Sequence, residues 1–166
     1  MTLFLTKATC TAVLSCLQDY QFVHIVSHRI LEPGKPFEAL FKLHRGKHLQ
    51  LLDIIWSQLP DAEFAFLSAC HTAELTEESI VDEVLHLAAA MQFCGFQSVV
   101  GTMWAMVDID GPDLARHFYE SVFSDEVQGG WYYKRTAGAL HNAMLNLCRK
   151  GGITLKCWVN FVHYGA

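Results

Sequence analysis

The sequence has little charge and no excess of basic residues. Charged side chains make up 17% of the 166 positions, and 12 Lys and Arg against 17 Asp and Glu give a net charge of −5 at pH 7. Proteins that bind nucleic acids usually carry a basic excess, so we expect no nucleic-acid partner. The hydrophobic fraction of 52% excludes intrinsic disorder, which requires low hydrophobicity and high charge.

The sequence also lacks long apolar runs, an export signal and paired cysteines. No apolar run approaches the ~20 residues that span a bilayer, so we expect no membrane partner. The first seven residues have neither the basic start nor the cleavage site of a signal peptide. No CxxC or HExxH spacing occurs, so we expect no metal and no other cofactor. We expect a cytoplasmic protein with free thiols at six positions: Cys10, Cys16, Cys70, Cys94, Cys148 and Cys157.

Helical and strand patterns alternate along the chain. Helices are expected over Thr9–Tyr20, Leu49–Leu59, Thr76–Cys94, Asp113–Phe123 and Thr136–Lys150. Short apolar strands are expected over Phe22–Ser27, Glu63–Ser68, Ser98–Met103 and Trp158–His163, with a small hairpin over Phe37–Leu43 and Lys47–Leu49. This alternation predicts an α/β fold with a mostly parallel sheet that is covered by helices on both faces.

The domain organisation follows from the same pattern. Without a linker or a repeat, residues 1–166 are expected to form a single domain. Four core strands would leave the Phe22–Ser27 strand at an exposed edge of the sheet. Together with the low charge, this suggests that strands on the N-terminal side are missing from this chain.

Candidate catalytic residues follow two of the expected strands. In open parallel sheets, sites form at the carboxyl ends of the strands. His28 ends the first strand segment, and Cys70 and His71 follow the second. If these strands are neighbours, their tips lie roughly 5 Å apart, and an imidazole could then convert the thiol into a nucleophilic thiolate. Backbone N–H groups of a turn at Cys70 could hold an oxyanion.

The neighbouring candidates are weaker. His71 is adjacent to Cys70, and adjacent residues of an extended segment point to opposite sides. His24 is expected to be a packed histidine, and the other five cysteines are expected to be buried structural residues inside helices or a strand. Asp108 follows the third strand, where its carboxylate could receive a basic substrate side chain or simply cap the next helix.

Four segments together resemble one known family. VHIVSH, which ends at His28, resembles the family's H-F-A-C-H-G, and LSACHTA, which contains Cys70, resembles its L-S-A-C-x-T-A. DEVLHLAAAMQFCGFQSVVGTMWAMVD and WVNFVHYG resemble its later motifs in the same order. The family is CHAT, the caspase-like domains that are often attached to tetratricopeptide repeats and are similar to separase and caspases. The resemblance covers Ala8 to Gly165.

The resemblance implies a three-layer α/β/α sandwich and a peptidase with a Cys/His dyad. His28 matches the general base and Cys70 matches the nucleophile. Backbone N–H groups of Arg29 and Cys70 match the oxyanion hole, and Asp108 matches the acidic residue that receives a basic side chain before the scissile bond. The implied partners are a protein or peptide substrate and tetratricopeptide-repeat regions or other domains of a larger protein.

Two departures from the family pattern keep a second hypothesis open. Arg29 replaces the glycine that follows the family's histidine, and whole CHAT domains are considerably longer. The first hypothesis is a cysteine endopeptidase that cleaves after a basic residue. The second is a catalytically impaired CHAT remnant that acts as a protein-interaction or signalling module.

Overall fold

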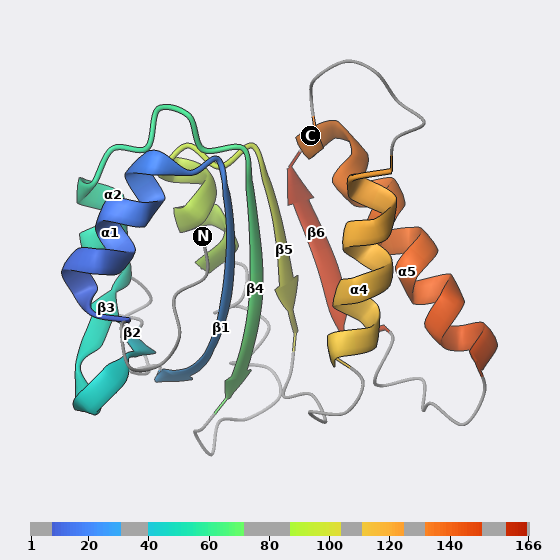
Figure 1. Ribbon diagram of the computed structural model, residues 1–166, viewed down its shortest axis with the longest axis horizontal. Coiled ribbons are helices and arrows are strands. Elements are labelled where there is room, and N and C mark those ends of the chain that lie inside the picture. Colours follow the sequence, from blue (N-terminus) through green and yellow to red (C-terminus); the bar gives the residue numbers. More distant parts are fainter. Residues whose placement is uncertain are drawn as a thin grey trace.

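The computed structural model describes residues 8–30, 40–71, 87–103, 111–124, 132–150 and 159–165. A six-stranded sheet in the order β3-β2-β1-β4-β5-β6 forms its centre (Figure 1). Asp108, Trp158, Cys157 and the first part of the helix expected from Thr76 lie outside the described residues. Within the described part of the chain, no helix is long and apolar enough to cross a membrane.

The centre of the sheet is mostly parallel. β1 (Phe22–Ile30) pairs in parallel with β4 (Phe64–His71), and β4 pairs in parallel with β5 (Ser98–Thr102). β6 (Phe161–Gly165) closes one side by antiparallel pairing with β5. These four strands form the core of the sheet, and their apolar sequences suit burial on both faces.

The expected hairpin extends the sheet beyond β1. β2 (Leu40–Lys42) and β3 (His48–Gln50) pair antiparallel with each other, and β2 pairs antiparallel with the last two residues of β1, Arg29 and Ile30. Within the described residues, the rest of that side of β1 has no strand partner. For the described residues this agrees with the open edge expected along Phe22–Ser27, and the hairpin pairs only with Arg29 and Ile30 beyond it.

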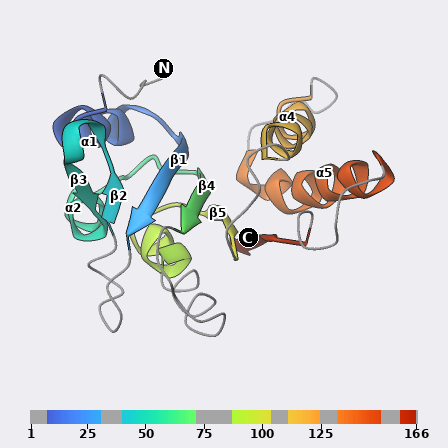
Figure 2. The same cartoon turned by 90° about the horizontal axis from the view of Figure 1, so that it is seen from below.

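Helices cover both faces and complete three layers. On one face, α1 (Cys10–Asp19), α2 (Leu51–Trp56) and a helix over residues 87–93 share an apolar core with Ala65 and Leu67 of β4. On the other face, α4 (Gly111–Val122) and α5 (Thr136–Lys150) pack on Phe64 and Phe66. Figure 2 shows α4 and α5 side by side. This arrangement confirms the α/β class.

Several element boundaries differ from the sequence predictions. β1 and β4 each continue three residues beyond the expected Ser27 and Ser68, so His28 and Cys70 lie inside strands and not just past their ends. The last strand, β6, begins at Phe161 instead of Trp158. α2 is shorter than the expected Leu49–Leu59, because Leu49 belongs to β3 and the helix is capped at Ser57.

A buried polar cluster ties α5 to the sheet. The Ser98 Oγ lies 2.6 Å from Thr136 Oγ1 and 2.8 Å from His163 Nε2, and Thr136 Oγ1 lies 3.0 Å from the same nitrogen. The Thr136 hydroxyl donates to the Tyr133 carbonyl at 2.6 Å, so the proton between the two hydroxyls comes from Ser98. His163 Nε2 must then carry the proton that bonds both oxygens. Burial lowers the pKa of His163, so the ring is neutral and protonated at Nε2 near pH 7.

We expect Thr136→Val to lower the free energy of unfolding by about 1–3 kcal/mol, because the same-sized side chain leaves buried partners unsatisfied. Thr136 is fully buried. Thr11→Val, at an exposed position of α1, is the control and should change stability by no more than about 0.5 kcal/mol. Urea denaturation of the two variants measures the difference, and equal stabilities would show that the cluster contributes nothing.

Candidate active site

The two proposed catalytic positions are direct neighbours in the sheet. The parallel register of β1 and β4 pairs His28 with Cys70. Neighbouring strands lie about 4.8 Å apart, so the two Cα positions are close enough for the side chains to come within hydrogen-bond reach. The prediction that these strands pair is confirmed. The histidine and the cysteine both lie near the carboxyl ends of the two strands.

The register is fixed by packing on both faces of the strands. The His24 ring lies 4.6 Å from the ring of its partner Phe66, and the Phe22 ring lies 6.5 Å from that of Phe64. On the opposite face, Val23 and Ile25 pack into the core that contains Ala65 and Leu67. A slip by one residue would exchange the two faces of β1, so these contacts also fix His28 opposite Cys70.

The face that carries positions 28 and 70 is accessible next to them. Successive residues of a strand alternate between faces, so positions 28 and 70 belong to the same face as His24, Val26 and Ser68. Val26, which pairs with Ser68, is 75% exposed, and Ser68 is half-buried. A small polar residue and an exposed aliphatic residue therefore lie on this face beside positions 28 and 70.

His24 is a packed histidine, as the sequence predicted, with a hydrogen-bond partner that the sequence did not indicate. Its Nε2 lies 3.1 Å from Ser68 Oγ, and its ring contacts Phe66 and Tyr119. Desolvation by this packing lowers the pKa of His24 to about 4. The ring is therefore a neutral hydrogen-bonding group at neutral pH, although His24 as a whole is an exposed residue.

Arg29 lies in extended backbone and is paired on both sides, with Phe41 of β2 and with His71 of β4. Among the described residues, the non-glycine positive φ values belong to Arg45 and Gln58, so Arg29 occupies a conformation that any residue adopts. N–H groups of paired strand residues lie in the plane of the sheet. A donor role for the Arg29 N–H in an oxyanion hole requires that this end of β1 opens locally.

The other cysteines differ more from one another than the sequence suggested. Cys10, Cys16, Cys94 and Cys148 are free, but only Cys94 is buried and Cys148 is exposed. The expectation that all five are buried is thus wrong at Cys148, which lies on the outer side of α5. Burial raises the pKa of Cys94 to about 11, and burial together with Asp53 raises that of Cys10. Both thiols are therefore poor nucleophiles near neutral pH.

A three-layer α/β/α fold with a histidine and a cysteine in register on neighbouring parallel strands defines the class of caspase-like proteins. The family model of the CHAT domain matches residues 2–166, and the chain belongs to the CHAT family, a caspase-like peptidase family. No curated protein matches the chain. Among the described residues, no group of three or more His, Cys, Asp or Glu side chains is placed to hold a metal ion.

We expect the His24 imidazole to titrate near pH 4, well below its ordinary 6.5. Between these values the unfolded chain binds a proton that the folded chain does not, so the free energy of unfolding falls as the pH falls through this window. An NMR titration of the His24 ring measures the midpoint. Tyr119→Ala should uncover the ring and move the midpoint toward 6.5, and a wild-type midpoint of 6.5 or above would contradict the packing argument.

Proposed function

We propose that the chain is a cysteine endopeptidase in which Cys70 is the nucleophile and His28 is the general base. The pairing of these two residues in the parallel register of β1 and β4 is the observation that carries the proposal. Membership of the CHAT family supports the same chemistry. The reaction needs neither a metal nor an organic cofactor.

The proposed reaction proceeds in two steps. His28 takes the proton of the Cys70 thiol, and the thiolate attacks the carbonyl carbon of the scissile peptide bond. The N–H groups of Cys70 and Arg29 would stabilise the oxyanion once the carboxyl ends of β1 and β4, in which both residues are paired, open locally. The C–N bond then breaks, the imidazolium gives its proton to the leaving amine, and a thioester remains. A water molecule, deprotonated by His28, hydrolyses the thioester and frees the thiol.

The proposed substrate is a protein or peptide segment with Arg or Lys before the scissile bond. Asp108 would bind that cation, because a carboxylate shielded from water is most stable when it is paired. The free cysteines at four described positions suit a reducing cytoplasm. Tetratricopeptide-repeat regions are the proposed partner elements.

A second candidate function is favoured by one observation at the dyad. Arg29 stands where the family has glycine, and it is held between two strands. Loss of an oxyanion donor costs roughly 10²–10³ in rate. If the Arg29 N–H stays in the sheet, the domain would hydrolyse peptides poorly and would act as an interaction or signalling module.

The first test is thiol reactivity in a Cys148→Ser background, which removes the exposed competing thiol. We expect Cys70 to be the fastest remaining cysteine to react with iodoacetamide, because the neighbouring imidazole raises its thiolate fraction. His28→Ala should slow this alkylation. Peptide mapping by mass spectrometry after timed quenching identifies the modified residue, and preferential reaction at Cys10 or Cys16 would contradict the dyad.

Cleavage of fluorogenic peptides tests the same dyad. Cys70→Ala should abolish hydrolysis of a peptide with Arg or Lys before the cleaved bond, whereas Cys148→Ser should leave it unchanged. Asp108→Asn should reduce cleavage of the basic peptide more than cleavage of a matched glutamine peptide. Equal losses on both peptides would assign Asp108 to a structural role and not to substrate recognition.

Arg29→Gly separates the two candidate functions. Glycine should loosen the pairing of β1 with β2, release the backbone N–H and raise the rate by about 10-fold or more. The initial rate of peptide cleavage measures this gain, and Arg29→Ala controls for loss of the side chain alone. If Arg29→Gly is inactive and Cys70 reacts no faster than a buried thiol, the interaction-module function is the better account.

A further inference from the structure

A polar groove runs between α4 and α5, and none of its lining residues belongs to the apolar core between these helices and the sheet. The core contacts of α4 come from Leu114, Phe118 and Val122, whereas its groove residues, His117, Glu120 and Ser121, lie on a neighbouring flank of the helix. Its volume is about 390 Å³. Seven residues line it: His117, Glu120, Ser121, Asn142, Leu145, Asn146 and Arg149.

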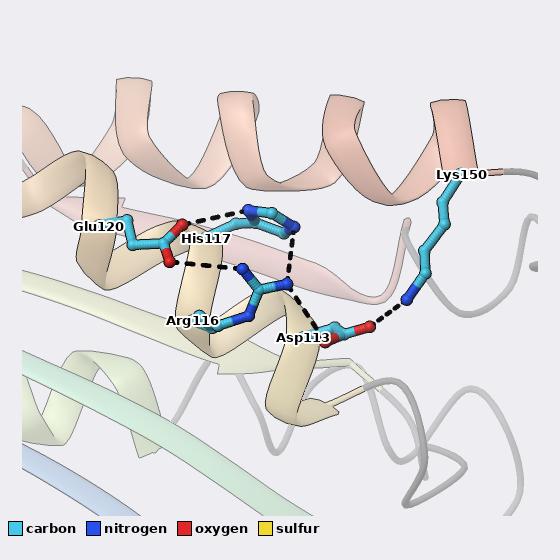
Figure 3. Close-up of polar contacts among 5 residues, drawn as sticks. All are labelled: Asp113, Arg116, His117, Glu120 and Lys150. Atoms are coloured by element: carbon cyan, nitrogen blue, oxygen red, sulfur yellow. Dashed lines mark hydrogen bonds and ion pairs between the residues drawn. The ribbon is translucent and has the colours of Figure 1, made fainter.

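Ionic and hydrogen-bonding contacts at both ends of the helix pair hold this groove open. At one end, Lys150 at the last position of α5 pairs with Asp113 in the first turn of α4 (Figure 3). At the other end, Arg135 donates to the Ser121 carbonyl at 3.0 Å and to Ser124 Oγ at 2.6 Å. The groove is therefore formed before any ligand binds, which reduces the entropy cost of binding.

The one acidic residue of the groove is already satisfied. The two carboxylate oxygens of Glu120 contact Arg116 at 3.3 Å and His117 Nδ1 at 3.4 Å (Figure 3). Arg116 also donates to His117 Nε2 at 3.3 Å. Because arginine has no acceptor, this nitrogen is unprotonated and Nδ1–H donates to Glu120. These contacts compensate the negative charge of the α4 side.

The α5 side, in contrast, presents donors that the described residues leave without a partner. Asn142, Asn146 and Arg149 are exposed, and within the described residues they have no hydrogen-bond or ion-pair partner. The two carboxamides are four residues apart, a rise of about 6 Å along the helix. Alternate residues of an extended peptide are about 6.7 Å apart, so the carboxamides match the spacing of alternate peptide units. Arg149 continues the same row one turn further.

We propose that the groove between α4 and α5 binds an extended peptide segment that carries an acidic side chain. Asn142 and Asn146 bond peptide units of its backbone, Arg149 pairs with its carboxylate, and Leu145 supports the apolar part of the chain. This recognition site uses neither Cys70 nor His28. Binding is therefore expected to persist in Cys70→Ala, and its failure would leave the peptidase proposal untouched.

The test titrates acetyl-Ala-Glu-Ala-Glu-amide into the ¹⁵N-labelled full chain and follows the resonances of Asn142, Asn146 and Arg149 by NMR. The matched glutamine peptide and sodium phosphate are titrated in parallel. We expect saturable shifts at these three residues, with tighter binding of the acidic peptide. Arg149→Gln should weaken the acidic peptide about fivefold, near the upper range for an exposed pair, and leave the glutamine peptide unchanged. Asn146→Ala should weaken both peptides.

Arg45→Gln, at an exposed arginine in the β2–β3 turn, is the matched control and should leave all binding unchanged. Any of three outcomes would overturn the proposal. The first is that the acidic peptide produces no saturable shifts, and the second is that Arg149→Gln binds it as tightly as the wild type. The third is that phosphate reproduces every peptide-induced shift with the same dependence on Arg149. The last result would show that the groove binds small anions and does not recognise a peptide backbone.

Discussion

The in-register parallel pairing of β1 with β4 is the interaction on which the rest of the structure depends. β4 contributes Ala65 and Leu67 to one core and Phe64 and Phe66 to the other. Both helical layers therefore attach to this strand, and β1 must match it on two faces at once. The same match sets His28 beside Cys70, so the stability of the sheet and the geometry of the proposed dyad have one cause.

Elements with local signals could be predicted from the sequence. The Thr9 hydroxyl accepts a hydrogen bond from the Ala12 N–H and caps α1, which begins at the next residue, Cys10. A threonine at this position predicts such a cap. α5 spans Thr136–Lys150 as predicted, because its apolar period is clear and two glycines follow. The ends of β1 and β4 could not be read in this way. Their last residues, including Arg29 and His71, are strand residues because remote partners pair with them.

The candidate site shows the same division. That positions 28 and 70 would be neighbours followed from the rule that parallel strands end at one edge of the sheet. The contact between His24 and Ser68 joins residues 44 apart, and that between Ser98 and His163 joins residues 65 apart, so no local pattern indicates either. Cys148 is different, because its exposure could have been predicted from the apolar period of α5. The buried face of α5 runs through Ala139, Leu140, Ala143 and Leu147, and position 148 falls outside that period.

The two faces of α4 explain why the dyad and the groove can be tested separately. Phe118 is fully buried against the sheet, whereas its neighbour His117 lines the groove. Substitutions on the groove face remove exposed polar atoms and leave the packing of Phe64 and Phe66 intact. Effects of mutations without shared partners usually add. A loss of cleavage caused by a groove variant would therefore mean that peptide binding at α4 and α5 is coupled to the β1–β4 edge through the shared core, and not that the fold is damaged.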